Sequence, residues 1–231
     1  MPFYKHYSFD LWLTLIKSNP SFKIERTRYF HQNFNAANKS IDEIAAIFRQ
    51  VDLMVNSINE KTGKNIDAEE MYLMVISQIN NYSNEFTDID IEGLYDTMEE
   101  LLVNNMPVLY CSECIDVLYK LRESGQSTTS LLSNTGFIKG KTLRKILTHL
   151  ELDQLLDFQL YSDEVKMSKP NPLFFRLMLD TINKDRHMNL DLNEIIHIGD
   201  NPLADVKGAE AIGIKSMLIN SNHLTISALT V

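Results

Sequence analysis

The sequence lacks a hydrophobic run long enough to cross a membrane. Of its 231 residues 44% are hydrophobic, but no stretch approaches the ~20 consecutive apolar residues of a transmembrane helix. The first six residues also lack the apolar core of a secretory signal. We therefore expect a cytoplasmic location and no membrane partner. The length suits one large domain, or a core domain with a smaller insert.

Basic residues are in short supply relative to acidic ones. The chain has 22 Lys and Arg against 31 Asp and Glu, a formal net charge of −9. A protein with this balance is on average repelled by the phosphate backbone of DNA or RNA. We expect no nucleic-acid partner, and nothing in the sequence indicates the oligomeric state.

Cysteine is nearly absent. The two that occur, Cys111 and Cys114, form a Cys-x-x-Cys pair near a predicted helix start. This spacing suits a redox dithiol or half of a zinc site, but zinc needs two further ligands. His6, His149, His187, His197 and His223 do not form a pair with the spacing of zinc ligands. Two partly buried helix cysteines in a reducing compartment are the favoured interpretation.

Helical periodicity dominates the first half of the chain after a short strand at residues 5–10. It predicts helices over residues 22–34, 41–62, 67–79 and 91–103. A capping box at Ser40 and Glu43 opens the second of these helices, and Gly63 suits its left-handed end. Pro107 ends the last helix. Residues 18–106 are therefore predicted to form an all-helical insert.

Helices and strands alternate from Cys111 onward. Strands are predicted at 128–133, 158–161, 195–199 and 215–219, and helices at 115–123, 139–150, 172–182 and 204–212. Nearly continuous apolar strands such as residues 195–198 are typical of a parallel sheet covered on both faces. The fold class is therefore α/β, a doubly wound parallel sheet built from residues 1–17 and 107–231.

Polar residues follow three of the predicted strands. Asp10, Ser133 and Asp200 each stand at a strand end, and Lys169 lies in the loop before the helix at residue 172. Ligands of open parallel sheets bind at the carboxyl ends of the strands. Each residue alone could serve only in a turn or a helix cap. Together they indicate a site that handles a phosphoryl group with a metal ion.

At these residues the chain resembles the haloacid dehalogenase-like (HAD) hydrolase superfamily, in its helical-cap (C1-type) form with a Rossmann-like core. The nucleophile motif of that family is matched by residues 9–15 and its Ser/Thr motif by residues 131–134. Its lysine motif is matched by residues 168–170 and its acidic motif by residues 198–205. The order and spacing agree across the whole predicted core.

The resemblance implies a role for each motif residue. Asp10 would be the nucleophile that forms an aspartyl-phosphate. Mg²⁺ would be held by Asp10, Asp200 and the backbone carbonyl of Trp12, with Asp205 binding an outer-shell water or orienting Lys169.

The substrate would be a small phosphorylated molecule. Ser133, Asn134 and Lys169 would bind its phosphoryl group, and Lys169 would also neutralise charge as the transition state forms.

Trp12 departs from the family pattern. Members that cleave phosphate esters usually carry a second aspartate at this position, which serves as general acid and base, and an indole can do neither. Loss of general acid–base catalysis typically costs ~10²–10⁴-fold in rate. Three explanations remain open: a phosphatase whose leaving group is good or whose acid comes from the insert, a metal-free dehalogenase-like enzyme, and a phospho-ligand-binding protein with reduced catalysis.

Two features bear on these alternatives. Asp200 and Asp205 favour a metal-dependent phosphatase, because a metal-free site would leave extra carboxylates beside the nucleophile uncompensated. The helical insert resembles the lid that the family places over its site and that sets specificity. Candidates to reach inward from it are Lys17, Arg26, Arg28 and His31, and the reference pKa of histidine makes His31 the candidate substitute acid.

Overall fold

The computed structural model describes residues 4–83, 86, 88–123, 125, 127–186 and 190–230. His187 lies outside the described residues. The strands are β1 His6–Phe9, β2 Ile16–Lys17, β3 Val108–Leu109, β4 Thr128–Ser133, β5 Phe158–Tyr161, β6 Ile195–Gly199 and β7 Lys215–Leu218. The α-helices are α1 Pro20–Asn33, α2 Ile41–Thr62, α3 Ala68–Ile79, α4 Ile91–Asn104, α5 Cys114–Glu123, α6 Gly140–His149, α7 Ser162–Val165, α8 Pro172–Arg186 and α9 Gly208–Glu210.

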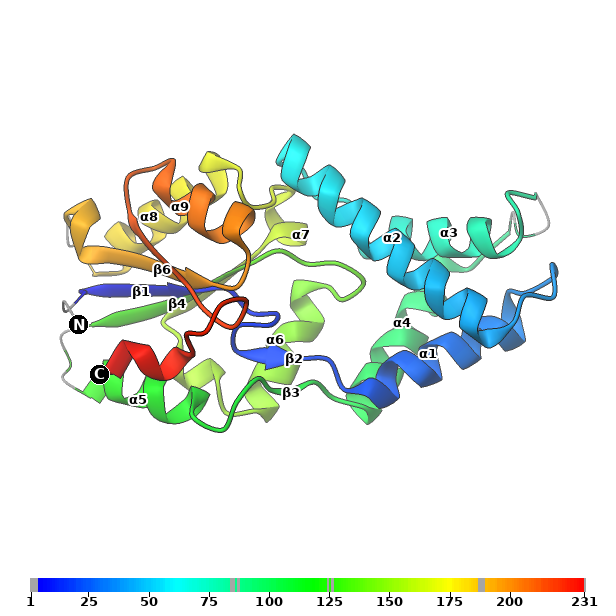
Figure 1. Ribbon diagram of the computed structural model, residues 1–231, viewed down its shortest axis with the longest axis horizontal. Coiled ribbons are helices and arrows are strands. Elements are labelled where there is room, and N and C mark those ends of the chain that lie inside the picture. Colours follow the sequence, from blue (N-terminus) through cyan, green and yellow to red (C-terminus); the bar gives the residue numbers. More distant parts are fainter. Residues whose placement is uncertain are drawn as a thin grey trace.

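Five parallel strands form the main sheet, in the order β5-β4-β1-β6-β7. Helices α8 and α9 cover one face, and α5 and α6 cover the other (Figure 1). The predicted α/β fold is confirmed. Since β1 lies between β4 and β6, the chain leaves it to one side and later returns on the other. The point of reversal is where open α/β sheets bind ligands.

Helices α1 to α4 pack together beyond the carboxyl ends of the strands, whereas both chain ends lie at the opposite end of the sheet (Figure 1). Ser40 caps α2 through a capping box, and Gly63 ends it with a φ of 67°. The chain enters and leaves this helical part through β2 and β3, which pair antiparallel. These two-residue strands were not predicted, because so short a segment carries no periodicity.

The apolar core is continuous between the sheet and the helical part. One buried cluster joins Phe9 and Leu131 of the sheet to Phe30, Phe48 and Tyr72 of the helices. A second cluster, which includes Phe174 and Phe175 of α8, fills the other face of the sheet. None of the described helices is long and apolar enough to cross a membrane.

The prediction of a helix over residues 204–212 was only partly correct. The chain forms a π-helical segment, Pro202–Lys207, and then the short helix α9. Asn201 begins the segment, since its side chain accepts hydrogen bonds from the N–H groups of Leu203 and Ala204. Its own N–H donates to the Asp205 carboxylate at 2.9 Å. The wide turn thus directs Asp205 back toward the sheet, and π-turns of this kind are frequent at functional sites.

Candidate active site

Strand register brings the predicted site residues to one edge of the sheet. Phe9 pairs with Leu131 of β4 and with Ile198 of β6. Asp10, Ser133 and Asp200 follow these three residues within two positions, so they emerge side by side at the carboxyl ends of adjacent strands. Asp10 and Ser133 are buried, and Asp200 is half-buried.

Lys169 joins two of the carboxylates. Its Nζ donates to Asp10 Oδ1 and to Asp205 Oδ1, each at 2.7 Å, and its side chain is 1% exposed. The Asn134 amide fixes the backbone of the lysine, because its oxygen accepts from Lys169 N–H at 2.7 Å and its nitrogen donates to Lys169 O at 3.0 Å. The loops after β4 and β5 therefore position one ammonium group between two acids.

Asp10, Asp200 and Asp205 form a carboxylate cluster. One oxygen from each lies within 4.8 Å of the others. Burial, followed by repulsion from Asp10 and Asp205, raises the pKa of Asp200 to about 7. Burial likewise raises the pKa of Asp10, against the opposing effect of Lys169. Three carboxylates and one ammonium carry a net charge of −2 when ionised, which fits a divalent cation, and carboxylate oxygens are ligands that Mg²⁺ prefers.

Within the cluster, Asp205 differs from the other two acids. Its Oδ1 accepts from Lys169 and from His197 Nε2, the latter at 3.2 Å, and its Oδ2 accepts from Asn201 N–H. Lys169 holds the pKa of Asp205 well below its usual range, although burial opposes this shift. Because Asp205 is 1% exposed and accepts three hydrogen bonds, it is better suited to orienting Lys169 than to direct coordination of a metal.

Three further residues support the cluster and were not predicted. Thr14 Oγ1 donates to Asp10 Oδ2 at 3.1 Å. His197, whose pKa is lowered chiefly by burial, lies between Ser8 Oγ at 2.9 Å and Asp205. Because a carboxylate only accepts, the neutral ring donates from Nε2 and accepts from Ser8. His197 is a core residue with a partner for each ring nitrogen, and nothing in its spacing along the sequence signalled the contact with Asp205.

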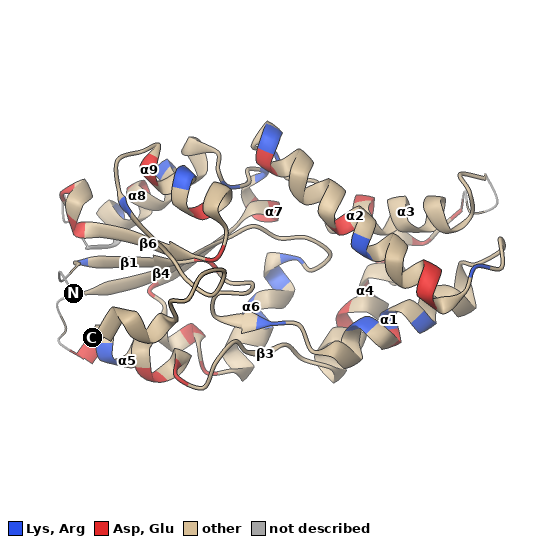
Figure 2. Cartoon of the chain, viewed as in Figure 1, with Lys and Arg blue, Asp and Glu red and all other residues tan. Residues whose placement is uncertain are grey.

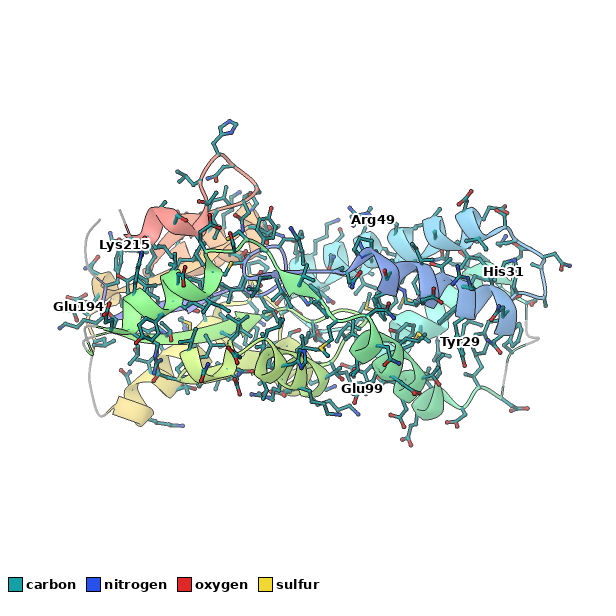
Figure 3. The ribbon with its side chains drawn as sticks, turned by 90° about the horizontal axis from the view of Figure 1, so that it is seen from below. Tyr29, His31, Arg49, Glu99, Glu194 and Lys215 are labelled. Atoms are coloured by element: carbon teal, nitrogen blue, oxygen red, sulfur yellow. The ribbon has the colours of Figure 1, made fainter. Side chains whose placement is uncertain are left out.

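The four predicted lid residues have different environments. Lys17 Nζ donates to the backbone oxygen of Tyr110 at 3.1 Å, and exposed Arg28 pairs with Glu25. His31 lies at the end of the helical part that is farthest from the sheet (Figure 3). The hypothesis that His31 replaces the general acid is therefore wrong. Arg26 is the buried member of the four, 8% exposed.

Trp12 is half-buried and packs against the main core cluster. It lies in the loop that joins β1 to β2, where Leu13 N–H donates to Ile16 O at 2.8 Å. The two cysteines lie elsewhere, at the start of α5. Their sulfur atoms are 3.2 Å apart, and burial raises the pKa of Cys114 to about 12.

A comparison with protein families agrees with this geometry. A model described as haloacid dehalogenase-like hydrolase matches residues 7–219. The chain belongs to this hydrolase family. The residues that carry the cluster, from Asp10 to Asp205, all fall inside the matched range.

Curated relatives of this HAD-like hydrolase are distant. The rhythmically expressed gene 2 protein of Drosophila melanogaster is 31% identical over 110 residues, which cover 48% of this chain and 41% of the fly protein. The glyceraldehyde 3-phosphate phosphatase of Pyrococcus abyssi is 24% identical over 168 residues, which cover 67% of this chain and 66% of that protein. The chain thus matches less than two thirds of the length of these relatives.

Among solved structures, the HAD-hydrolase YfnB of Bacillus subtilis, determined bound to magnesium, superposes with a TM-score of 0.71. The sequence identity is 15%, and the match covers 96% of this chain and 92% of that one. At this identity the similarity establishes the fold of the HAD-like hydrolase and not its substrate.

Proposed function

We propose that this HAD-like hydrolase is a Mg²⁺-dependent phosphatase that acts on a small phosphorylated metabolite through an aspartyl-phosphate at Asp10. The observation that carries the proposal is the charge of the cluster, in which Lys169 pairs with Asp10 and Asp205 while Asp200 lies within 4.8 Å of both without a cation of its own among the described residues. Two unit charges ~4 Å apart at an effective dielectric of ~20 repel by about 4 kcal/mol. The ionised cluster therefore favours a divalent cation, and a phosphate substrate brings further negative charge that requires one.

The residues would share the work as follows. Asp10, Asp200 and the carbonyl of Trp12 would hold Mg²⁺, which supplies positive charge to bring the phosphoryl group against the anionic nucleophile. Thr14 and Lys169 contact different oxygens of Asp10 and fix the plane of its carboxylate. Ser133 and Lys169 would bind the phosphoryl oxygens. Asn134 would support binding through Lys169, whose backbone it holds.

The reaction would proceed in two displacements. A carboxylate oxygen of Asp10 attacks phosphorus, the bond to the leaving oxygen breaks, and the leaving group departs. Water then attacks the phosphorus of the aspartyl-phosphate, which releases inorganic phosphate and regenerates Asp10. The phosphatase activity named for the Pyrococcus abyssi relative supports this chemistry.

Trp12 points to a leaving group that needs no proton. Among the described residues that contact the cluster, Thr14 already donates to Asp10 and His197 is fully buried between two partners. Acyl phosphates expel a carboxylate and therefore need no general acid. If the reaction does need an acid, Glu60 at the end of α2 is the alternative proton donor. Its position supports this role, because its carboxylate accepts a hydrogen bond from Asn201 Nδ2 at 2.8 Å, and Asn201 follows Asp200 in the sequence.

A second candidate function is supported by Trp12 as well. A dehalogenase acting without metal would suit an aromatic residue at this position, because its halide leaving group needs no proton. A phospho-ligand-binding protein with reduced catalysis is the third alternative. The net charge of −2 on the ionised cluster, with Asp200 unpaired among the described residues, favours the phosphatase over both. We further propose that residues 18–106 act as a cap domain over the site formed by residues 1–17 and 107–231.

Turnover of p-nitrophenyl phosphate, acetyl phosphate and 2-chloropropionate, each with Mg²⁺ and with EDTA, tests the proposal. We expect phosphate release that needs Mg²⁺ and that disappears in Asp10→Asn, while circular dichroism shows the fold of that variant to be intact. Halide release that survives EDTA would instead support the dehalogenase. Retained phosphate binding without any turnover would support the binding protein.

A further inference from the structure

Arg26 is a buried cation without a counter-ion. It lies in α1 and is 8% exposed, yet it forms no ion pair with any residue that the structure describes. Its Nε is the one buried side-chain polar atom without a hydrogen-bond partner in the described part of the chain. A buried N–H that stays unpaired costs the free energy of its lost hydration, so its retention calls for an explanation.

Aromatic rings surround the Arg26 guanidinium. Its central carbon lies 3.9 Å from the ring centre of Phe48, 4.8 Å from that of Phe137 and 5.3 Å from that of Phe22. The Tyr72 hydroxyl and the carboxylate of Asp52 both favour its charged form, and Asp52 also pairs with Arg49 at 3.3 Å. Rings can hold the planar group in place, but they leave its edge N–H groups available for an oxyanion.

The loop that follows Ser133 contacts Arg26 through Phe137. Phe137, which the guanidinium contacts, is four residues beyond Ser133, and its backbone oxygen accepts from the Tyr72 hydroxyl at 3.2 Å. A β-carbon at Gly136 would lie 4.0 Å from Asp52 Oδ1. Helices α1 to α3 therefore cover this loop, and Arg26 is the buried cation in that cover.

We propose that Arg26 binds a second anionic group of the substrate, a carboxylate or a second phosphate, while the transferred phosphoryl group occupies the site at Asp10. This inference rests on the proposed phosphatase function and makes its substrate class narrower. A guanidinium edge matches the two oxygens of a carboxylate or phosphate with two parallel hydrogen bonds. Pairing of this kind would satisfy Nε and neutralise the buried charge.

Non-hydrolysable phosphonates test the inference by calorimetry in the presence of Mg²⁺. The probes are methylphosphonate, which has no second anion, 3-phosphonopropionate and 4-phosphonobutyrate, which carry a carboxylate, and ethane-1,2-diphosphonate, which carries a second phosphonate. The variants are Arg26→Gln, Arg26→Lys and Arg26→Met. Arg28→Gln is the matched control, because Arg28 is an exposed arginine on the same helix.

We expect the wild type to bind at least one two-anion probe more tightly than methylphosphonate. Arg26→Gln and Arg26→Met should weaken that binding about tenfold or more, the usual effect of a lost charge-assisted hydrogen bond. Arg26→Lys should retain part of the affinity, and methylphosphonate should bind all variants alike. The carboxylate and diphosphonate probes identify which second anion is preferred.

If the Arg26 variants lose affinity equally for all probes, or lose none, the inference is overturned and Arg26 is a structural cation. A thermal melt separates the two roles further. If Arg26 is structural, Arg26→Met should melt at a lower temperature than the wild type; if Arg26 serves to bind the ligand, the melting temperature should not fall. Phosphate release from p-nitrophenyl phosphate reports on the proposed function by itself. If that release is absent while Arg26-dependent binding persists, the proposed function fails alone. If release occurs but no two-anion phosphonate binds in a way that depends on Arg26, the inference fails alone.

Discussion

Three acids and one lysine meet at the end of β1, and their charges determine the chemistry of individual residues. Asp10 and Asp205 share Lys169, whereas Asp200 is paired with no cation among the described residues. Asp200 is consequently the acid whose ionisation the metal-free fold resists most clearly, with a pKa raised from 3.8 to about 7. A bound divalent cation would reverse that resistance.

The first prediction concerns Asp200 and pH. Between pH 3.8 and about 7 the native state holds a proton on Asp200 that the unfolded chain has lost, so this group lowers the free energy of unfolding as pH rises through that window. Because Asp200 is half-buried, solvent reduces the effect to about 1–2 kcal/mol. We expect metal-free Asp200→Asn to exceed the wild type in stability by this amount at pH 8 and not at pH 4.

Urea melts in EDTA measure this difference, and exposed Asp96 provides the control variant Asp96→Asn. Mg²⁺ should stabilise the wild type at pH 8 and should have little effect on Asp200→Asn. A wild type that is more stable than Asp200→Asn at pH 8 without metal would contradict the charge argument.

The second prediction concerns Trp12 and the leaving group. Without a general acid the rate should fall steeply as the pKa of the leaving alcohol rises. Trp12→Asp should raise kcat/KM for alkyl phosphates by about 10²-fold, with little change for 2,4-dinitrophenyl phosphate. Rates for a series of substituted phenyl phosphates give the slope of log(kcat/KM) against the pKa of the leaving phenol, for the wild type and for Trp12→Asp.

The same series tests Glu60 as the alternative donor. If Glu60 supplies the proton, the wild type has a shallow slope and Glu60→Gln makes it steep. If Trp12 marks a reaction that needs no acid, Glu60→Gln leaves the slope unchanged. A shallow slope in both proteins would show that another group donates the proton.

At the scale of elements, the strands of the main sheet were predictable, whereas the two-residue strands β2 and β3 and the contacts between loops were not. The bounds of β4, β5 and β6 coincide with the predicted ranges, because buried parallel strands are short apolar runs. The positions of Asp10, Ser133 and Asp200 follow from strand ends alone. The π-turn at Pro202–Lys207 was missed, since its form depends on the Asp205 carboxylate folding back to Asn201.

Long-range pairing also explains what the sequence could not show at the site. Asn134 and Lys169 are 35 residues apart, and Ser8 and His197 are 189 apart, so no local spacing connects them. His31 and Arg26 share one helix, and both were candidates to reach inward. Only the packing of α1 separates them, because it buries Arg26 and leaves His31 at the far end (Figure 3).

The third prediction concerns Gly199, the last residue of β6. A β-carbon there would lie 2.1 Å from Asp205 Oδ2 and 2.2 Å from its Cγ. Gly199→Ala should displace Asp205 and with it Lys169, lowering stability by about 1–3 kcal/mol as in other overpacked cores and lowering kcat more than tenfold. Gly136→Ala is the control for stability, because its nearest neighbour would be 3.9 Å away. Equal melting temperatures for Gly199→Ala and Gly136→Ala would refute the packing argument.

At the scale of the whole molecule, the turn between α2 and α3 joins the helical part to the sheet. Gly63 O accepts from Ser168 N–H at 3.1 Å and from Asn171 Nδ2 at 2.9 Å. Asn65 Oδ1 accepts from Ser162 Oγ at 2.7 Å, and Ser162 in turn accepts from Thr135 N–H. Acidic and basic residues are interspersed over both parts (Figure 2). The turn therefore contacts the loop that carries Lys169 directly, and it reaches the loop after Ser133 through Ser162.

The fourth prediction follows from that contact. Asn65→Ala should lower kcat/KM about tenfold, because the loop after Ser133 loses its link to the proposed cap, while stability falls by only about 1 kcal/mol. Lys166→Ala is the matched control, since its exposed pair with Asp67 spans the same junction and is worth less than about 1 kcal/mol. Wild-type kinetics in Asn65→Ala would show that this junction does not support the site.

Trapping the covalent intermediate tests the central claim most directly. The enzyme is quenched during Mg²⁺-dependent turnover of p-nitrophenyl phosphate, treated with borohydride, which reduces an aspartyl-phosphate to homoserine, and digested for mass spectrometry. The proposed mechanism predicts homoserine at position 10, dependent on both substrate and Mg²⁺. Phosphate release with Asp10 unmodified and another residue carrying the phosphoryl group would contradict it.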